Sequence, residues 1–283
     1  MNKISTVVFT AFFILLSLLI ATCSPEKPRE RVVSEETEDY LSLNDEVTYI
    51  LPSPLQIASI FKRSGMTYIP GITNPASNAK NYTGAFNQSL AMGVYSADLA
   101  YSIVNNQTQE ALSHLKTLKD ISHDLGFASV FETESIINRF ENNLGNEDSL
   151  TQIISDLQMD MDIYMEENEK AHLGAIIFTG AWIESVYLGS KTIEKNNNVT
   201  LSGKVGEQFI ILENLIKTLH AKRNANDKIH LLIIELQKLK KYFDTIANKE
   251  ENENDPFNMR EEDLNQLTSA IQSLRSKIIA GNF

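Results

Sequence analysis

The chain has very little cysteine: Cys23 is the single one among 283 residues. One cysteine excludes an internal disulfide framework, so cysteine pairs say nothing about the compartment. The chain also lacks an excess of positive charge, because 25 lysines and arginines face 37 acidic residues and leave a formal net charge of −12. That charge repels phosphate backbones, and nucleic acid is therefore not expected as a partner.

Convincing segments of alternating apolar and polar residues, the pattern of a half-buried strand, are also lacking. Apolar residues instead recur every three or four positions, as they do on the buried face of a helix. One such series is Tyr82, Phe86, Leu90, Val94, Ala97, Tyr101 and Val104. Similar series continue to the C-terminus, and 42% apolar residues are enough for a core. We therefore predict an all-α fold, a multi-helix bundle of about nine helices.

The N-terminus places the cysteine directly after an apolar run. Residues 7–21 are almost uninterruptedly apolar, but they are too few and too lightly flanked for a spanning helix, which predicts a cleaved secretory signal. The junction Leu19-Ile20-Ala21-Thr22-Cys23 resembles the bacterial lipobox, with Thr22 where glycine, alanine or serine is usual. The resemblance implies that Cys23 is acylated and becomes the mature N-terminus. The alternative is an ordinary signal that leaves Cys23 as a free thiol.

These features divide the chain into three expected parts: a lipoprotein signal peptide at 1–22, a flexible acidic tether at 23–50 and a single helical domain at 51–283. Residues 24–47 contain eight acidic and three basic residues and too few apolar ones to offset the entropy of ordering. Acyl chains on Cys23 would hold the protein on a membrane without spanning it. We expect a location in the bacterial cell envelope, on the outer membrane and facing the periplasm.

The domain opens with a well-marked helix start in "LPSPLQIASIFKRSG". Ser53 is a natural N-cap, Pro54 fits the first helical position and Gln56 completes a capping box. Gly65 is expected to end the helix, because glycine readily takes the left-handed conformation at a helix C-terminus.

One segment, "LGAIIFTGAWIESVYL" at 173–188, is apolar nearly all round and too short to span a bilayer, which predicts the central core helix of the bundle. Its expected companion is the helix around "GVYSADLAY". The two share a glycine, then an aromatic residue two positions on, then an acid within the next turn: Gly93, Tyr95 and Asp98 against Gly180, Trp182 and Glu184. This match indicates a duplicated helical hairpin.

Four blocks, "LPSPLQIASIFKRSG", "LAMGVYSADLAY", "RFENNLGNEDSL" and "GAWIESVYLG", together resemble an uncharacterised helical lipoprotein family of Bacteroidetes. The resemblance covers most of residues 50–190. It implies a location in the envelope and brings no established activity with it.

Metal and catalytic motifs are weak. Glu169 with His172 and Asp120 with His123 have the spacing of three that puts two ligands on one helical face. Both pairs lie near expected helix ends, without further inward glutamates, so surface groups are the preferred interpretation. No serine elbow or phosphate-binding loop is present, and we expect no metal, no cofactor and no enzymatic activity.

Asp98 and Glu184 are notable because a carboxylate in an apolar helix needs a partner or a shifted pKa. Either they line a polar pocket together with Tyr95, Tyr101, Trp182 and Tyr187, or each is hydrogen-bonded within the core or points outward at the edge of a stripe.

Three functions remain open. The first is a non-enzymatic, membrane-tethered protein that binds another envelope component, an envelope protein partner, through its bundle face. The second is a small-ligand binding or sensing module with a pocket between the core helices, and an enclosed cavity of roughly 300 Å³ at Tyr95, Asp98, Trp182 and Glu184 would favour it. The third is a metal-dependent enzyme.

Overall fold

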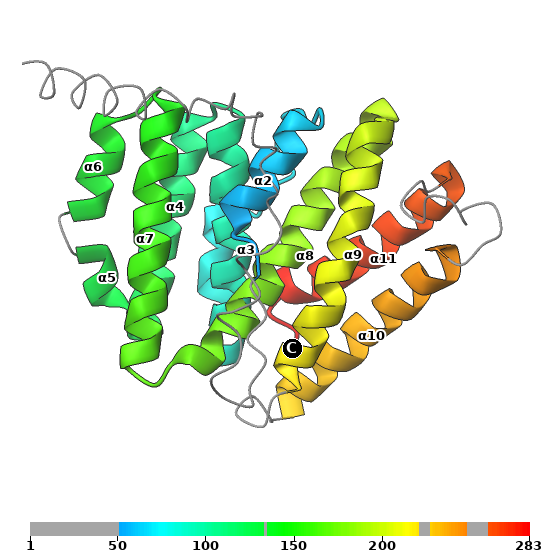
Figure 1. The fold of residues 1–283 in the computed structure, drawn as a ribbon. Coiled ribbons are helices and arrows are strands. Elements are labelled where there is room, and N and C mark those ends of the chain that lie inside the picture. Colours follow the sequence, from blue (N-terminus) through cyan, green and yellow to red (C-terminus); the bar gives the residue numbers. More distant parts are fainter. Residues whose placement is uncertain (1–50, 133–134, 221–226, 248–259) are drawn as a thin grey trace, which may run out of the picture. The chain divides into compact units, whose positions relative to one another are not determined.

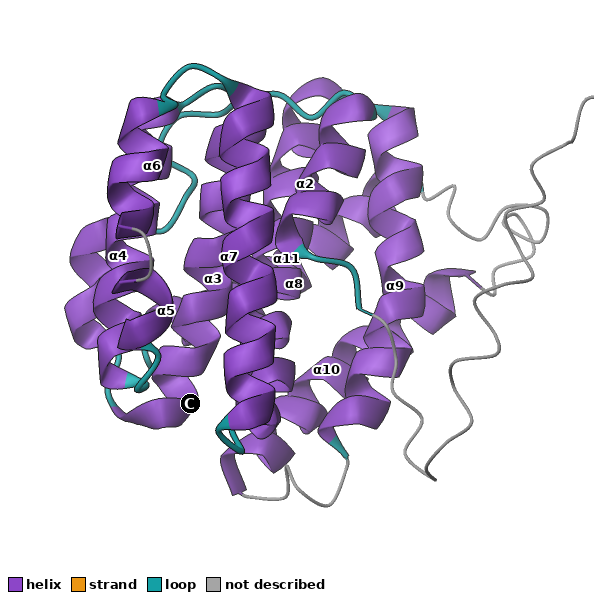
Figure 2. Ribbon diagram, turned by 60° about the vertical axis from the view of Figure 1, so that its left-hand side comes forward, coloured by secondary structure: helices purple, strands orange, loops and turns teal. Residues whose placement is uncertain are grey.

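The computed structural model describes residues 51–132, 135–220, 227–247 and 260–283. The expected signal peptide, the tether and Cys23 lie outside this part of the chain. Within it the chain forms ten α-helices, nine of them with seven or more residues, and one 3₁₀ helix. Figure 2 shows no strand among the described residues. The predicted all-α bundle of about nine helices is confirmed.

The helices follow one another with short connections. In chain order they are α2 (Pro54–Arg63), the 3₁₀ helix η1 (Ala76–Asn81), α3 (Gly84–Val104), α4 (Thr108–Asp124), α5 (Ala128–Glu132), α6 (Ile136–Asn142), α7 (Glu147–Glu167), α8 (Ala171–Asn196), α9 (Val199–Leu219), α10 (Asp227–Ala247) and α11 (Glu261–Ile279).

The start of α2 has the geometry that its sequence predicts. The Ser53 side chain accepts a hydrogen bond from the backbone N–H of Gln56 at 3.1 Å, and the Gln56 side chain accepts one from the backbone N–H of Ser53 at 2.7 Å. This reciprocal capping box satisfies two backbone donors that the helix itself leaves unpaired. The helix ends before Gly65, whose φ of 99° is the left-handed conformation expected there.

Helices α3 and α8 form the centre of the described domain (Figure 1). They share the most extensive contact between any two helices of the described residues, with α4 packed against α3, and α9 and α11 packed against α8. Helix α8 is the one described helix that is long and apolar enough to cross a membrane by composition. Because 83% of its most apolar window is buried inside the protein, it is a core helix, as predicted.

The contact between α3 and α8 depends on the two glycines of the matched segments. A Cβ atom on Gly93 would lie 1.8 Å from the carbonyl oxygen of Ile177, and one on Gly180 would lie 2.1 Å from that of Leu90. The contact is reciprocal. Ile177, which meets Gly93, lies three residues before Gly180, and Leu90, which meets Gly180, lies three residues before Gly93. The two backbones therefore touch directly, and only glycine fits at either position.

We expect Gly180→Ala to lower the free energy of unfolding by about 2 kcal/mol or more, because the new methyl group would force two backbones apart. Gly174 provides a matched control on the same helix: a Cβ atom there would lie 3.7 Å from Met165 Cε, an ordinary contact. Gly174→Ala should therefore raise stability by about 0.5 to 1 kcal/mol through its helix propensity. Urea unfolding of the purified variants measures the change in the free energy of unfolding for each one. Equal changes at the two positions would contradict the close contact.

Candidate functional site

The six side chains predicted to line a pocket are all buried in the core. Tyr95, Asp98, Trp182 and Glu184 are 0% exposed, Tyr101 is 1% and Tyr187 is 7%. None of the six lines the apolar cavity between α2, α3, α4, α5, α7 and α8 or the groove between α2 and α7. The six residues therefore fill the core instead of lining the pocket expected for them, and the alternative of hydrogen-bonded groups within the core describes them better.

Three of the aromatic side chains have protein partners for their polar atoms. The Tyr95 hydroxyl donates to the Pro75 carbonyl at 2.8 Å, and Trp182 Nε1 donates to the Gln208 carbonyl at 3.2 Å. The Tyr101 hydroxyl accepts from the backbone N–H of Ile69 at 2.7 Å. Buried polar groups of this kind are stable only when they are paired, and these three are.

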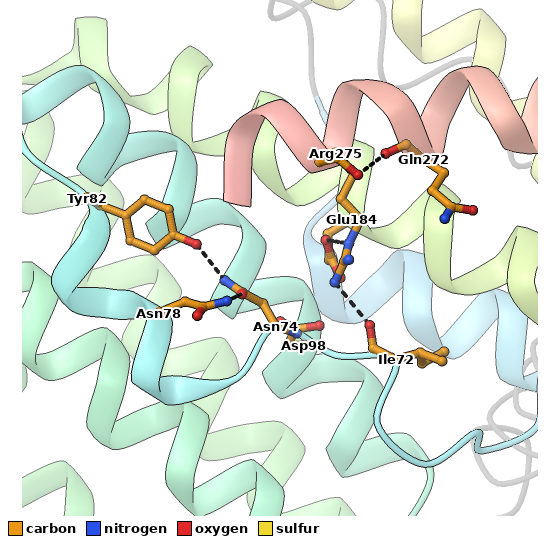
Figure 3. Close-up of polar contacts among 9 residues, drawn as sticks. Ile72, Asn74, Asn78, Tyr82, Asp98, Glu184, Gln272 and Arg275 are labelled. Carbon is orange, nitrogen blue, oxygen red and sulfur yellow. Dashed lines mark hydrogen bonds and ion pairs between the residues drawn. The ribbon is translucent and has the colours of Figure 1, made fainter. Parts of the chain in front are cut away.

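Glu184 forms a buried ion pair with Arg275 of α11 (Figure 3). Arg275 Nε and Nη2 donate to the two carboxylate oxygens at 2.6 and 2.7 Å, and Nη2 also donates to the Ile72 carbonyl at 3.0 Å. The guanidinium group lies 4.0 Å from the ring centroid of Tyr187. Burial acts against the charge on Arg275, but attraction and hydrogen bonding to Glu184 outweigh it and raise the pKa of the guanidinium. One residue thus joins α8, α11 and the loop before η1.

Asp98 interacts electrostatically with both members of this ion pair. Its Oδ2 accepts a hydrogen bond from the backbone N–H of Asn74 at 3.0 Å, whereas Oδ1 has no donor. Burial, then repulsion from Glu184, raises the pKa of Asp98 well above its ordinary value. Two adjacent buried carboxyl groups do not both ionise beside one arginine. Burial and the neighbouring carboxylate therefore favour the neutral, protonated form of Asp98.

Asn74 connects this cluster to the tyrosines around it. Its side-chain amide donates to the Tyr82 hydroxyl at 2.8 Å and its side-chain oxygen accepts from Asn78 at 2.8 Å. The rings of Tyr82 and Tyr95 meet edge to face, with centroids 6.3 Å apart. We call Asp98, Glu184, Arg275 and Asn74 the core polar cluster. Its groups are buried and, apart from Asp98 Oδ1, hydrogen-bonded, which is the arrangement of a structural network.

The sequence reasoning identified both acids of the core polar cluster but not Arg275 or Asn74. A signal for Arg275 was present: it lies four residues after Ile271 and three before Ile278, on the apolar stripe of its helix. A charged residue on a buried stripe requires a buried partner of opposite charge. Asn74 lies in a loop, where no periodic pattern exists to show burial.

A buried histidine was also missed. His114 on α4 is 4% exposed, and neither ring nitrogen has a hydrogen-bond partner among the described residues. Burial lowers the pKa of its imidazole to about 4, so the ring is neutral at neutral pH. It packs against Tyr95 with ring centroids 6.0 Å apart.

The two metal-ligand pairs considered from the sequence lie at helix ends. Asp120 and His123 are in the last turns of α4, and the turn between α7 and α8 contains Glu169, whose φ is 58°. His123 and His172 are exposed. Among the described residues, no group of three or more histidine, cysteine, aspartate and glutamate side chains is arranged to hold a metal ion.

An apolar cavity of about 260 Å³ lies elsewhere, between α2, α3, α4, α5, α7 and α8. Its lining is apolar except for Ser96, Gln158 and Asp162, and it includes the three methionines Met92, Met161 and Met165. Ser96 donates its hydroxyl proton to the Met92 carbonyl at 2.8 Å, so it is already paired. Asp162 is the one titratable residue of the lining, and partial burial raises the pKa of its carboxyl.

An open groove of about 1060 Å³ between α2 and α7 adjoins this cavity. The two share Leu51, Leu55, Gln158 and Asp162, so that the cavity opens beside the groove. The groove wall carries polar side chains together with two exposed apolar ones, Met159 at 57% and Ile163 at 47%. We call the first space the cavity and the second the α2–α7 groove.

Comparisons with models of known protein families, with curated proteins and with solved structures each give no match. The resemblance to lipoproteins of Bacteroidetes stays a prediction, and function has to be argued from the geometry of the chain itself.

The raised pKa of Asp98 predicts a pH effect. The unfolded chain releases the Asp98 proton above about pH 4, whereas the raised pKa favours the protonated form in the folded chain. The contribution of Asp98 to the free energy of unfolding is therefore complete below about pH 4 and is lost as the pH rises. Asp98→Asn keeps an acceptor for the backbone N–H of Asn74 and has no titrating proton. Relative to the parent, the free energy of unfolding of this variant should increase by up to about 1.4 kcal/mol per pH unit above pH 4, as long as native Asp98 stays protonated.

Denaturant unfolding between pH 4 and 7 measures this difference. Asp160→Asn, an exposed position on α7, is the matched control and should change stability equally at every pH. A constant difference between the parent and Asp98→Asn across that range would show that Asp98 is ionised in the folded protein.

Proposed function

We propose that this chain is a non-enzymatic, lipid-anchored binding protein of the bacterial cell envelope whose helical domain holds a small apolar ligand. The observation that supports this proposal is the cavity between α3, α7 and α8, with its apolar lining and its opening at the α2–α7 groove. It is the second of the functions considered from the sequence, with the site moved from the six predicted residues to a cavity that none of them lines.

The size and lining of the cavity suit a small molecule. Its 260 Å³ exceeds the volume of about 150 Å³ that is sufficient for benzene, and it approaches the lower end of ligand sites at about 300 Å³. Methionine side chains are flexible and polarisable, so the three in the lining can adapt to a guest.

The lining offers little chemistry besides binding. Acid–base or nucleophilic catalysis needs at least two cooperating groups, such as a nucleophile with its base. Ser96 already donates to a backbone carbonyl, and Asp162 has no titratable neighbour in the lining. These features support a binding role over an enzymatic one.

A second candidate is the binding of an envelope protein through the bundle face. The exposed apolar side chains of Met159 and Ile163, both on the wall of the α2–α7 groove, favour it, since apolar groups gathered on a surface are typical of interaction sites.

Toluene should bind the protein and raise its melting temperature by about 2–4 °C at saturation, because a ligand that binds only the folded state stabilises it. Gly174→Leu should remove this effect, since a side chain there points towards Met165 and fills the cavity. Gly203→Leu is the matched control, because its Cβ would meet open space away from the cavity. Toluene stabilisation that persists in Gly174→Leu would refute the cavity as the site.

The anchor is tested separately at Cys23, which lies outside the described residues. Cys23→Ala should leave the protein unprocessed or soluble, because acyl chains contribute about 0.8 kcal/mol per buried methylene to membrane attachment. Detergent phase partitioning and mass spectrometry of the mature N-terminus measure this. Unchanged partitioning of Cys23→Ala, or a bare thiol in the parent, would rule out the lipid anchor.

A further inference from the structure

We infer that the ligand is a single-chain amphiphile, whose alkyl chain of eight to ten carbons fills the cavity and whose head group donates hydrogen bonds to Asp162 at the mouth. This inference rests on the proposed function and names the class of ligand.

The volume of the cavity sets the length of the chain. A cavity of about 150 Å³ accommodates the six carbons of benzene, which corresponds to about 25 Å³ per carbon. On that scale 260 Å³ takes about ten carbons. The lining comes from six helices, from Pro54 on α2 to Phe131 on α5, and it is almost entirely apolar, which suits an alkyl chain.

The position of the opening requires a molecule with two different ends. The cavity meets the α2–α7 groove at Leu51, Leu55, Gln158 and Asp162. A ligand whose apolar part fills the cavity therefore places its other end against Gln158 and Asp162, next to water. That end has to be polar, because an apolar end placed against the Asp162 carboxylate would remove water from it without replacing the lost hydrogen bonds.

The charges at the mouth determine the kind of head group. The Asp162 carboxylate makes no hydrogen bond or ion pair with any described residue, so its oxygens are free to accept. The other charged residues of the groove are Arg63 and Glu166, which makes two acids against one base. Hydroxyl and ammonium groups donate to a carboxylate, whereas a second carboxylate is repelled by it.

Titration calorimetry with primary n-alkanols from butanol to dodecanol tests the chain. The chain from residue 23 onward, made without the apolar N-terminal run, keeps every described residue and needs no detergent, which would compete. Affinity should rise about fourfold per added methylene up to eight to ten carbons and then stop rising. If toluene binds but alkanol affinity does not depend on chain length, the ligand class is wrong while the cavity function stands. If neither binds, both proposals fall.

The head group is tested with eight-carbon probes. Octanol and octylamine should bind at least ten times more tightly than octanoate. Asp162→Asn should remove most of this preference, and Asp160→Asn, exposed two residues earlier on α7, should keep it. A thermal melt confirms that each variant is folded. Octanoate that binds the parent as tightly as octanol does, or an unchanged preference in Asp162→Asn, would overturn the assignment of Asp162.

Discussion

The direct contact between the α3 and α8 backbones is the constraint on which the other features depend. Gly93 and Gly180 leave no space for a side chain between the helices, so the axes approach more closely than side-chain packing would allow. Asp98 follows its glycine by five residues and Glu184 follows by four. The close approach therefore brings two carboxyl groups of different helices together about one turn beyond the crossing.

This juxtaposition explains the remainder of the core polar cluster. Two carboxyl groups in the core cost solvation free energy and repel each other, and two adjustments relieve this cost. Asp98 keeps its proton, and Arg275 neutralises Glu184 through two short hydrogen bonds. Because replacing one partner of a buried ion pair costs about 3–5 kcal/mol, α11 is held in one position against α8. The cluster thus fixes how the C-terminal helix packs.

The sequence predicted those parts of the structure that follow from short-range patterns. The helix stripes, the capping box at Ser53 and the central position of α8 each need only a few neighbouring residues to be recognised. The matched glycines and acids also predicted which two helices lie together. The ionic partner of Glu184 lies 91 residues away on another helix, and no local pattern connects the two. The cavity was not predictable, because its volume depends on how side chains of six helices pack.

The cavity and the core polar cluster are two results of the same crossing. Met92, Ile177 and Ala181, all within three residues of one of the two glycines, line the cavity, whereas Asp98 lies between the cavity-lining Ser96 and Leu99 without being part of the lining. One wall of the cavity is therefore formed by two helices whose backbones already touch, and a buried ion pair holds one of them, α8, against α11. The opposite wall is formed by α2 and α7, which meet across an open groove. A ligand that enters the cavity from the groove therefore passes the side of α2 and α7, since the α3 and α8 side of the site has no room to move.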